Sequence, residues 1–522
     1  MNKTVIGALM IFIFIVAGAV GVKLLLPYFE EIRQKTTSDA VKTKGKIRID
    51  LDNWIGYFPL RSSEMKNLMR RSGYILLCND DNADYAARMK RLKSDETDFA
   101  VATVDSFILN AKPQNYPGTI VMVIDESKGG DALLARKDKI ADIDDIKGKA
   151  DIRVALTPGS PSHYLAKAVA YHFNVPELLP SKKLLIETKG SAKACDKLIA
   201  GKTDIAVCWE PDVSRALDSG GTVKILGSED TGHLIVDVLL VSRKFVQKNP
   251  DVISLFLSNY FNVLKKYREN PDLLFEHVKR EISLPDELIR SMLKGVKWVN
   301  FSENCEKWFG ISAPGGCTDE GLTDTIDSTV RILVNAGDFS QNPIPGEDPY
   351  RLINSSFLEK LFVNGISGFS GSGFGKSIPV SFNSIAAIFT PLDEAHWNSL
   401  KEVGTLKLEP IAFQRGSADL DILARQLIDK AVERLWHYPN FRILIKAHTG
   451  IRGDKDENRL LSQKRADAVA RYLTNTHSID NNRIKAIGFG GTKPLIKKPG
   501  ETKRAWHYRL PRVEIVLVRE EY

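Results

Sequence analysis

The chain of 522 residues lacks the sequence patterns that accompany most kinds of catalysis and metal binding. It has no Gly-x-Ser-x-Gly pattern, no P-loop pattern and no ordered Ser/His/Asp set. Its five cysteines form no Cys-x-x-Cys pair and no metal-ligand spacing. In an exported protein Cys305 and Cys317 could close a short loop by disulfide, and reduced buried thiols are the alternative. We therefore expect no enzymatic activity, no cofactor and no metal site.

Positive charge is not spread evenly along the chain. The net charge is +8, and residues 401–522 hold 24 Lys or Arg against 15 Asp or Glu. The remaining 400 residues are close to neutral. A basic surface favours anionic partners, such as anionic lipid, the cell wall or nucleic acid. Because no nucleic-acid-binding motif is present, we expect no nucleic-acid partner.

An uncharged apolar stretch of 18 residues runs from Val5 to Val22, which is long enough to span a bilayer. The alternative is a cleavable signal peptide, for which Ala17-Gly18-Ala19 offers a cleavage pattern. We expect residues 1–27 to form a transmembrane anchor, or that signal peptide, and residues 28–45 to form a tether. Either interpretation exports the rest of the chain. The anchor predicts a single-pass protein of the cell inner membrane with its bulk in the periplasm.

The body of the chain divides into two α/β regions. From residue 46 to residue 363, short apolar strands alternate with helical stretches, which predicts mainly parallel α/β sheets in two lobes. Residues 364–376 are rich in Gly and Ser and are typical of a flexible linker. Residues 377–522 resume the pattern as a smaller α/β sandwich. The predicted fold is thus α/β, with an N-terminal transmembrane helix, a two-lobed domain and a C-terminal sandwich.

Seven short stretches stand in order along residues 46–363: Trp54–Tyr57, Asp98–Ala102, Gly130–Ala135, Asp144–Lys149, Gly159–Tyr164, Cys208–Pro211 and Asp237–Phe245. Together they resemble bacterial solute-binding proteins of the nitrate/sulfonate/taurine type. The resemblance implies a type II periplasmic-binding-protein fold whose two lobes close on a small-molecule solute. We expect the hinge near Ser127–Gly130.

Candidate solute-binding residues lie at the C-terminal ends of predicted strands, where open α/β sheets bind ligands. Ser160 and Ser162 could present N–H groups to an anion, or one of them could simply cap a helix. Glu210 and Asp237 suit a ligand with a cationic or donor group, or they could complement a helix dipole and fix a strand end. The aromatic candidates could be ligand walls or core. The predicted set is Trp54, Tyr57, Ser127, Ser160, Ser162, Trp209, Glu210 and Asp237.

The C-terminal region has a second resemblance. Ala447-His448-Thr449-Gly450, then Asn458, then Leu461–Val469 resemble the OmpA-like peptidoglycan-binding family. The family uses an Asp and an Arg to hold the charged ends of the diaminopimelate side chain, which needs one group of each sign.

Arg465 matches the family's Arg and Asn458 matches its Asn, but Gly450 stands where the family has Asp. Asp454, in the same loop, is the nearest substitute, or it is only a solvated loop acid. We predict Thr449, Asp454, Asn458 and Arg465 as the peptidoglycan-binding residues.

These features predict a membrane-anchored periplasmic protein that binds a solute and attaches to peptidoglycan, as a sensor, scaffold or transport-associated receptor. The alternative is a structural wall-anchoring subunit of a membrane complex, with a stator-like architecture and partner subunits. Val5–Val22 contains no carboxylate, so ion conduction through the apolar stretch is not expected.

Overall fold

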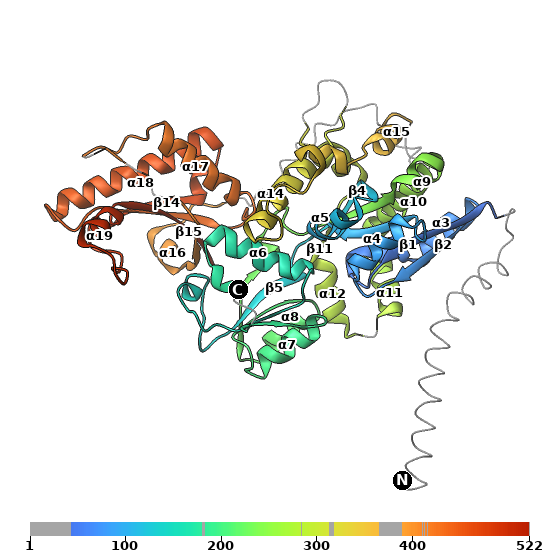
Figure 1. Ribbon diagram of the computed structural model, residues 1–522, viewed down its shortest axis with the longest axis horizontal. Coiled ribbons are helices and arrows are strands. Elements are labelled where there is room, and N and C mark those ends of the chain that lie inside the picture. Colours follow the sequence, from blue (N-terminus) through green and yellow to red (C-terminus); the bar gives the residue numbers. More distant parts are fainter. Residues whose placement is uncertain are drawn as a thin grey trace, which may run out of the picture.

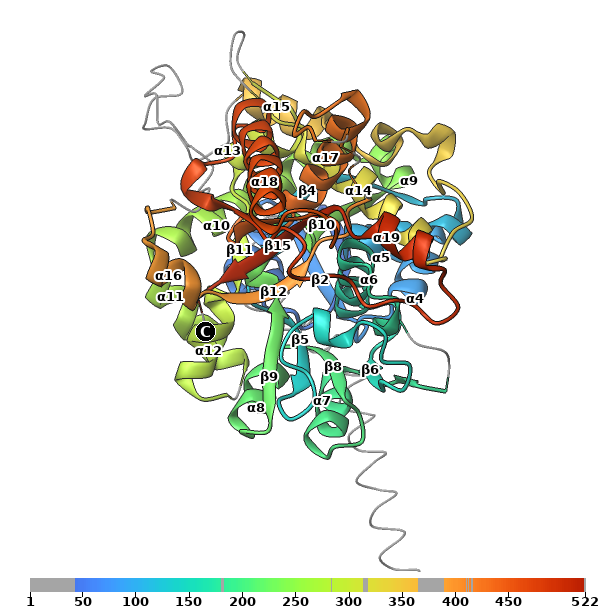
Figure 2. The ribbon, with the colours of Figure 1, turned by 90° about the vertical axis from the view of Figure 1, so that its left-hand side faces the viewer.

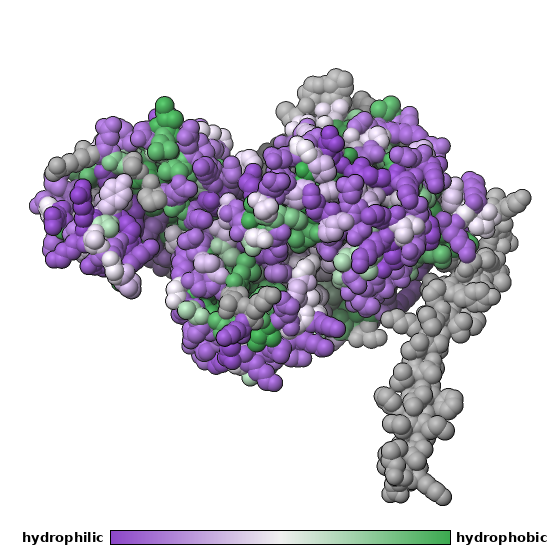
Figure 3. Space-filling view, viewed as in Figure 1, coloured by the Kyte–Doolittle hydropathy of each residue, from purple (hydrophilic) through white to green (hydrophobic). Residues whose placement is uncertain are grey.

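The computed structural model describes residues 43–179, 183–282, 284–312, 318–364, 389–409, 411, 413–414 and 416–520. It shows a two-lobed domain and a C-terminal domain, and each of these three units is built around one β-sheet (Figure 1). The face seen in Figure 3 is mostly hydrophilic across all three units, with apolar residues gathered in their interiors.

The first lobe contains a six-stranded sheet of order β11-β4-β10-β3-β1-β2. The strands are β1 (Gly45–Leu51), β2 (Tyr74–Asp80), β3 (Phe99–Thr103), β4 (Gly118–Ser127), β10 (Val236–Ser242) and β11 (Val296–Trp298). Its helices are α2 (Phe58–Arg61), α3 (Ser63–Arg71), α4 (Tyr85–Lys93), α5 (Val104–Ala111), α9 (Arg243–Lys248), α10 (Pro250–Glu269), α11 (Pro271–Glu281), α12 (Asp286–Lys294), α13 (Phe301–Glu303), α14 (Gly321–Asn335) and α15 (Ser356–Asn364). The central strands are buried along their whole length because helices cover both faces of the sheet.

The second lobe contains a five-stranded sheet of order β7-β6-β8-β5-β9. The strands are β5 (Asp131–Arg136), β6 (Val154–Leu156), β7 (Leu185–Glu187), β8 (Ile205–Trp209) and β9 (Thr222–Gly227), and the helices are α6 (Pro161–Phe173), α7 (Ser191–Ile199) and α8 (Asp212–Asp218). Helix α6 begins where the Ser160 hydroxyl accepts the N–H of His163, and Pro161 occupies its first position.

Two chain segments connect the lobes, and both sheets are mixed rather than mainly parallel. Strand β4 ends at Ser127 and β5 begins at Asp131, while β9 ends at Gly227 and β10 begins at Val236. Strand β10 is antiparallel to β3 and β4, and β5 is antiparallel to β8 and β9. The direction follows from the topology, because a strand that returns from the other lobe must run opposite to the strand that left. We call the segment Ser228–Ile235 the second crossing.

The C-terminal domain contains a four-stranded sheet of order β12-β15-β13-β14. Its elements are α16 (Glu394–Ser399), β12 (Lys401–Thr405), α17 (Ile422–Leu435), β13 (Arg442–His448), α18 (Lys455–His477), β14 (Ile484–Gly488), α19 (Lys503–Arg509) and β15 (Arg512–Arg519). Helices α17 and α18 pack against each other, and α18 covers β13 and β14. The Asp454 carboxylate caps α18 by accepting the N–H groups of Asp456 and Glu457.

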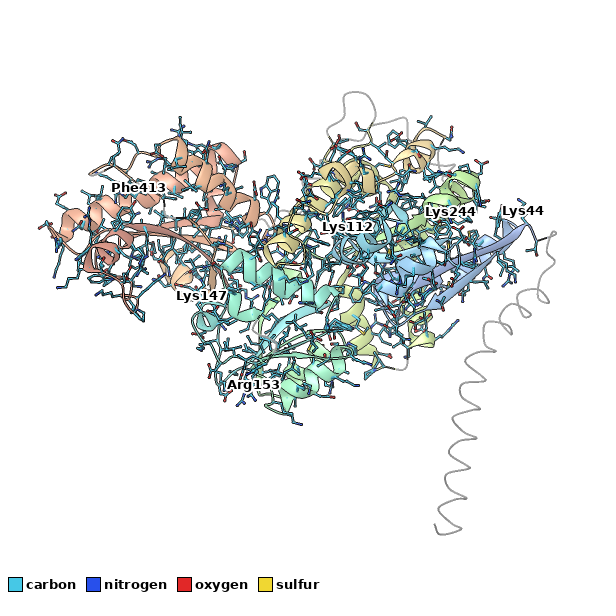
Figure 4. All side chains as sticks on the ribbon, viewed as in Figure 1. Lys44, Lys112, Lys147, Arg153, Lys244 and Phe413 are labelled. Carbon is cyan, nitrogen blue, oxygen red and sulfur yellow. The ribbon has the colours of Figure 1, made fainter. Side chains whose placement is uncertain are left out.

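The C-terminal domain packs directly on the second lobe, and Figure 2 shows its orange and red elements above the teal and green elements of that lobe. The Ile143 N–H donates to the Val403 carbonyl at 2.9 Å, and the Lys407 N–H donates to the His172 carbonyl at 2.7 Å. Lys147, labelled in Figure 4, donates to the carbonyl of Thr405 at 3.4 Å. Buried apolar residues of both lobes and of the C-terminal domain form one continuous cluster.

Two buried histidines lie in this interface. The rings of His172 and His437 stack with centroids 5.1 Å apart. His172 Nδ1 pairs with the Tyr438 hydroxyl at 2.9 Å, and His437 Nε2 pairs with the Ser328 hydroxyl at 2.8 Å. His437 Nδ1 lies 3.0 Å from the carbonyl of Gly232 in the second crossing. Burial lowers the pKa of His437 to about 4 and lowers the pKa of His172 as well.

The predicted N-terminal transmembrane helix is a wrong element of the fold prediction. Within the part of the chain that the structure describes, no helix combines the length and the apolar character that a membrane span needs. Helices α10 and α18 are long, but both carry several charged residues. The described fold is mixed α/β, with a two-lobed domain and a four-stranded C-terminal domain. The predicted anchor (1–27), the predicted linker beyond Asn364 and Cys317 lie outside the described residues.

The His437 environment predicts a pH dependence of stability. Because its pKa falls from the ordinary value near 6.5 to about 4 on folding, the unfolded chain binds more protons between these pH values. The stabilisation is complete above pH 6.5 and is lost as pH falls toward 4. Between pH 7 and pH 4.5, the wild type should lose about 2 kcal/mol more unfolding free energy than His437→Gln. Denaturant unfolding measures this difference, with the exposed His396→Gln as control. Equal losses in the wild type and His437→Gln would contradict the assignment.

Candidate functional site

A cavity of about 830 Å³ lies between the two lobes. Six of the predicted solute-binding residues line it, and they come from both lobes: Trp54, Tyr57 and Asp237 from the first, and Ser160, Trp209 and Glu210 from the second. Apolar side chains such as Ile235, Leu284 and Met292 complete parts of the wall. The size and lining are those of a small-molecule site.

Ser127 and Ser162 do not line the cavity, but both bind a residue that does. The Ser127 hydroxyl donates to Asp131 Oδ2 at 3.0 Å, and the Ser162 hydroxyl donates to Asp131 Oδ1 at 2.7 Å. Ser127 also lies 2.9 Å from the hydroxyl of Ser228, which accepts the N–H groups of Gly129 and Asp131. These contacts join both inter-lobe segments to the carboxylate of Asp131. Burial raises the pKa of Asp131 to about 6.

Within the first lobe, Trp54 and Tyr57 donate hydrogen bonds to two buried carboxyls. The Trp54 indole N–H donates to Asp125 Oδ1 at 3.3 Å, and the Tyr57 hydroxyl donates to Asp237. Asp125 and Asp237 are opposite each other on β4 and β10. Burial raises the pKa of Asp125 to about 7, and burial with repulsion from Asp125 raises the pKa of Asp237 well above its usual range.

The remaining predicted residues combine a structural contact with a place in the cavity wall. Ser160 caps α6, as the simpler alternative predicted. Glu210 accepts the N–H and the hydroxyl of Ser214 at the start of α8, at 3.1 and 2.9 Å. Burial raises the pKa of Glu210. Trp209 ends β8, and its N–H donates to the Ser191 hydroxyl at 3.0 Å.

Sequence reasoning missed Asp52, Asp125 and Asp131, although Asp52 and Asp131 line the cavity. Asp125 carried a usable signal, because it is a carboxyl that directly follows the apolar run Ile120–Ile124 inside the buried strand β4. Asp131 stands beside the predicted hinge, and only the fold brings Ser162 onto its carboxylate.

The predicted peptidoglycan-binding residues fall into two separate groups. Thr449 directly follows β13 and donates its N–H to the Gly490 carbonyl at 2.9 Å. Asp454 caps α18, and the Asn458 side chain donates to the Arg452 carbonyl at 3.0 Å in the same loop. Arg465 lies roughly 15 Å further along α18, given a helical rise of ~1.5 Å per residue. Asp454 and Arg465 therefore cannot hold one amino-acid centre together.

Arg465 instead contacts the segment that precedes α17. Its guanidinium lies 4.7 Å from the ring centroid of Phe413, which Figure 4 places in the C-terminal domain. It also donates to the carbonyl oxygens of Ser417 at 3.0 Å and Gln414 at 3.3 Å. Burial lowers the pKa of Arg465. An exposed carboxylate, Asp419, accepts the Ser417 hydroxyl at 2.8 Å in this segment.

Comparison with known proteins assigns the two regions to two families. Residues 80–273 match the family described as NMT1/THI5 like, and residues 412–506 match the OmpA family. The chain joins an NMT1/THI5-like domain to an OmpA domain. The combination that the sequence predicted is confirmed.

Individual relatives match one region each. A peptidoglycan-associated lipoprotein of Buchnera aphidicola is 39% identical over 72 residues, which are 14% of this chain and 40% of that protein. The taurine-binding periplasmic protein of Escherichia coli is 25% identical over 198 residues, which are 35% of this chain and 58% of that protein. The chain thus spans about half the length of these curated relatives.

Solved structures resemble the NMT1/THI5-like domain at low identity. The periplasmic aliphatic sulphonate binding protein of Escherichia coli has a TM-score of 0.43 and 16% identity, with 57% of this chain and 89% of that chain covered. The nitrate-binding protein of Synechocystis PCC 6803 has a TM-score of 0.42 and 13% identity, with 64% and 90% covered. The relatives are named as taurine-binding, sulphonate-binding and peptidoglycan-associated proteins, which agrees with the prediction that the chain is not an enzyme.

Packing at the hinge of the NMT1/THI5-like domain predicts a sensitive glycine. A Cβ on Gly130 would lie 2.3 Å from the indole of Trp54 and 2.9 Å from the Ser127 hydroxyl. Gly130→Ala should therefore displace Trp54 from Asp125 and lower stability by about 1–3 kcal/mol, as overpacking does. Thermal unfolding and tryptophan fluorescence measure both effects. Gly221→Ala is the control, since no atom lies within 4 Å of its Cβ position. An unchanged melting temperature and spectrum for Gly130→Ala would contradict this packing.

Proposed function

We propose that the protein binds a small solute between the lobes of its NMT1/THI5-like domain and attaches to peptidoglycan through its OmpA domain. The observation that carries the solute site is the inter-lobe cavity of about 830 Å³, which residues of both lobes line. Ligands that contact both lobes of such a domain favour the closed arrangement. The relatives named as taurine-binding and peptidoglycan-associated proteins support the two halves of the proposal.

The proposed compartment is the periplasm, where peptidoglycan and binding proteins of this kind meet. Placement at the inner membrane stays a prediction of the sequence, because residues 1–27 lie outside the described part of the chain. We propose a sensor or scaffold role rather than that of a freely diffusing carrier. The direct packing of the OmpA domain on the second lobe and second crossing supports this role.

The wall-binding half can be tested with the full chain and purified peptidoglycan in a co-sedimentation assay. Arg465→Ala should reduce the affinity for peptidoglycan at least tenfold, because a charge-assisted contact is worth roughly 1.5–3 kcal/mol. Arg471→Ala is the matched control, since Arg471 is an exposed residue of the same helix. Undiminished sedimentation of Arg465→Ala would remove Arg465 from the site.

A second variant tests the departure from the OmpA family pattern by gain of binding. No atom lies within 4 Å of a Cβ built on Gly450, so an Asp side chain fits there without rearrangement. Gly450→Asp should restore the carboxylate that the family presents to the ammonium of diaminopimelate and raise peptidoglycan affinity several-fold. The same co-sedimentation assay measures the change. Unaltered or weaker binding by Gly450→Asp would show that position 450 does not face the wall peptide.

A further inference from the structure

The cavity between the lobes is strongly acidic. The carboxylates that line it are Asp52, Asp131, Glu210, Asp212, Asp237 and Glu281, and Arg61 is the cationic side chain among its lining residues. Three of the carboxylates have an arginine partner: Asp52 pairs with Arg88 at 3.1 Å, Asp212 with Arg215 at 2.9 Å, and Glu281 with Arg61 at 2.6 Å. Each of these three thus has a cationic partner within the protein, although Arg88 also pairs with Asp81 and Arg215 also pairs with Asp196.

The other three carboxylates accept hydrogen bonds from neutral groups. Asp131 accepts two serine hydroxyls, Glu210 accepts the N–H and hydroxyl of Ser214, and Asp237 accepts the hydroxyl of Tyr57. Within the described part of the chain, no salt bridge joins any of the three to Lys, Arg or His. They come from both sides of the hinge, because Asp237 belongs to β10, Asp131 begins β5 and Glu210 follows β8.

A further carboxyl lies directly behind this group. Asp125 is fully buried and lies opposite Asp237 in the sheet. Its Oδ1 accepts the Trp54 indole N–H, and its Oδ2 has no hydrogen-bond partner among the described residues. Burying carboxylates together without a cation is costly, because each loses hydration and repels its neighbours, and the raised pKa values of Asp125, Asp131 and Asp237 are the expression of this cost. A positively charged ligand would remove this cost, and a negatively charged one would increase it.

Several of the groups that could receive an anion are already engaged, although the start of α7 at Ser191 and Ala192, which no side chain caps, also lines the cavity. Arg61 donates Nε to Glu281, and its Nη1 donates to the carbonyl oxygens of Asp52 and Trp54. At the start of α6, the His163 N–H donates to the Ser160 hydroxyl and the Gly159 N–H donates to the His163 ring. A sulfonate or nitrate would therefore find the arginine and these N–H groups occupied.

We propose that the solute is a small organic cation, an amine or guanidine, whose charge lies among Asp131, Glu210 and Asp237. The inference rests on the proposed function, since it assumes that the inter-lobe cavity binds a solute. The aromatic rings of Trp54, Tyr85 and Trp209 in the cavity wall add faces that attract cations and cover the apolar part of the ligand. The ligand class thus differs from the taurine, sulfonate and nitrate named in the relatives.

The test is isothermal titration calorimetry of the full chain with two matched sets of probes at pH 7.5. The cationic set is benzylamine, agmatine, putrescine and choline, and the anionic set is benzenesulfonate, methanesulfonate and nitrate. We expect saturable binding by at least one cation and none by the anions. Binding by an anion alone would overturn the cation assignment and leave the proposed solute binding intact. Absence of saturable binding by either set would contradict both.

Conservative substitutions test whether the carboxylates of the cavity bind the cation. Glu210→Gln should weaken binding of the cation at least tenfold, because no salt bridge joins its half-buried carboxylate to a cation in the described part of the chain, and the nearby Lys224 pairs with Glu229. Asp237→Asn should do the same, but it also touches the buried Asp125 and Tyr57, so its melting temperature must be compared with that of the wild type. Asp196→Asn is the control, because Asp196 pairs with Arg215 on the surface of the second lobe. Equal affinities of Glu210→Gln and Asp196→Asn would overturn the assignment.

Discussion

The contacts between the OmpA domain and the second crossing fix the position of both candidate sites. The Gly232 N–H donates to the carbonyl of His437 at 2.8 Å, the Asn440 side chain donates to the carbonyl of Glu229 at 2.9 Å, and Arg519 pairs with Asp230 at 2.5 Å. This same crossing leads into β10, which carries Asp237. A change in the angle between the lobes must move this segment. Such a movement would therefore also alter the contacts that the segment makes with the OmpA domain. The two domains are therefore in direct contact at this crossing in the described structure.

The second constraint is electrostatic. Asp131 and Glu210 keep neutral hydrogen-bond partners, and Asp125 has one oxygen without any partner among the described residues. A protein that only needed stability would gain by replacing such groups with apolar side chains. Their retention at one cavity is explained if a ligand supplies the missing charge. The same fold can bind ligands of opposite charge because the site depends on a few side chains rather than on the architecture.

The strands with continuous apolar residues were predictable, since Phe99–Ala102 and Ile205–Cys208 correspond to β3 and β8. Strand direction was not, because a local apolar pattern is the same for a parallel and an antiparallel neighbour. The polar strand β12 gives no apolar signal and forms by pairing with β15. For the site, strand ends indicated Trp54 and Glu210, which line one cavity, whereas Asp237 lines the same cavity from the start of β10 and not from its carboxyl end. The hydrogen bond from Arg465 to the Ser417 carbonyl could not be predicted, because it depends on tertiary packing between segments that are distant in the sequence.

The central claim is that one protein holds a cation-binding cleft on the cell wall. Equilibrium dialysis of full-length protein already bound to purified peptidoglycan, with benzylamine or whichever probe cation binds most tightly, tests it most directly. The account predicts one cation per wall-bound protein, with an affinity similar to that of the free protein. Wall-bound protein that takes up no cation, or that takes up benzenesulfonate instead, would contradict it.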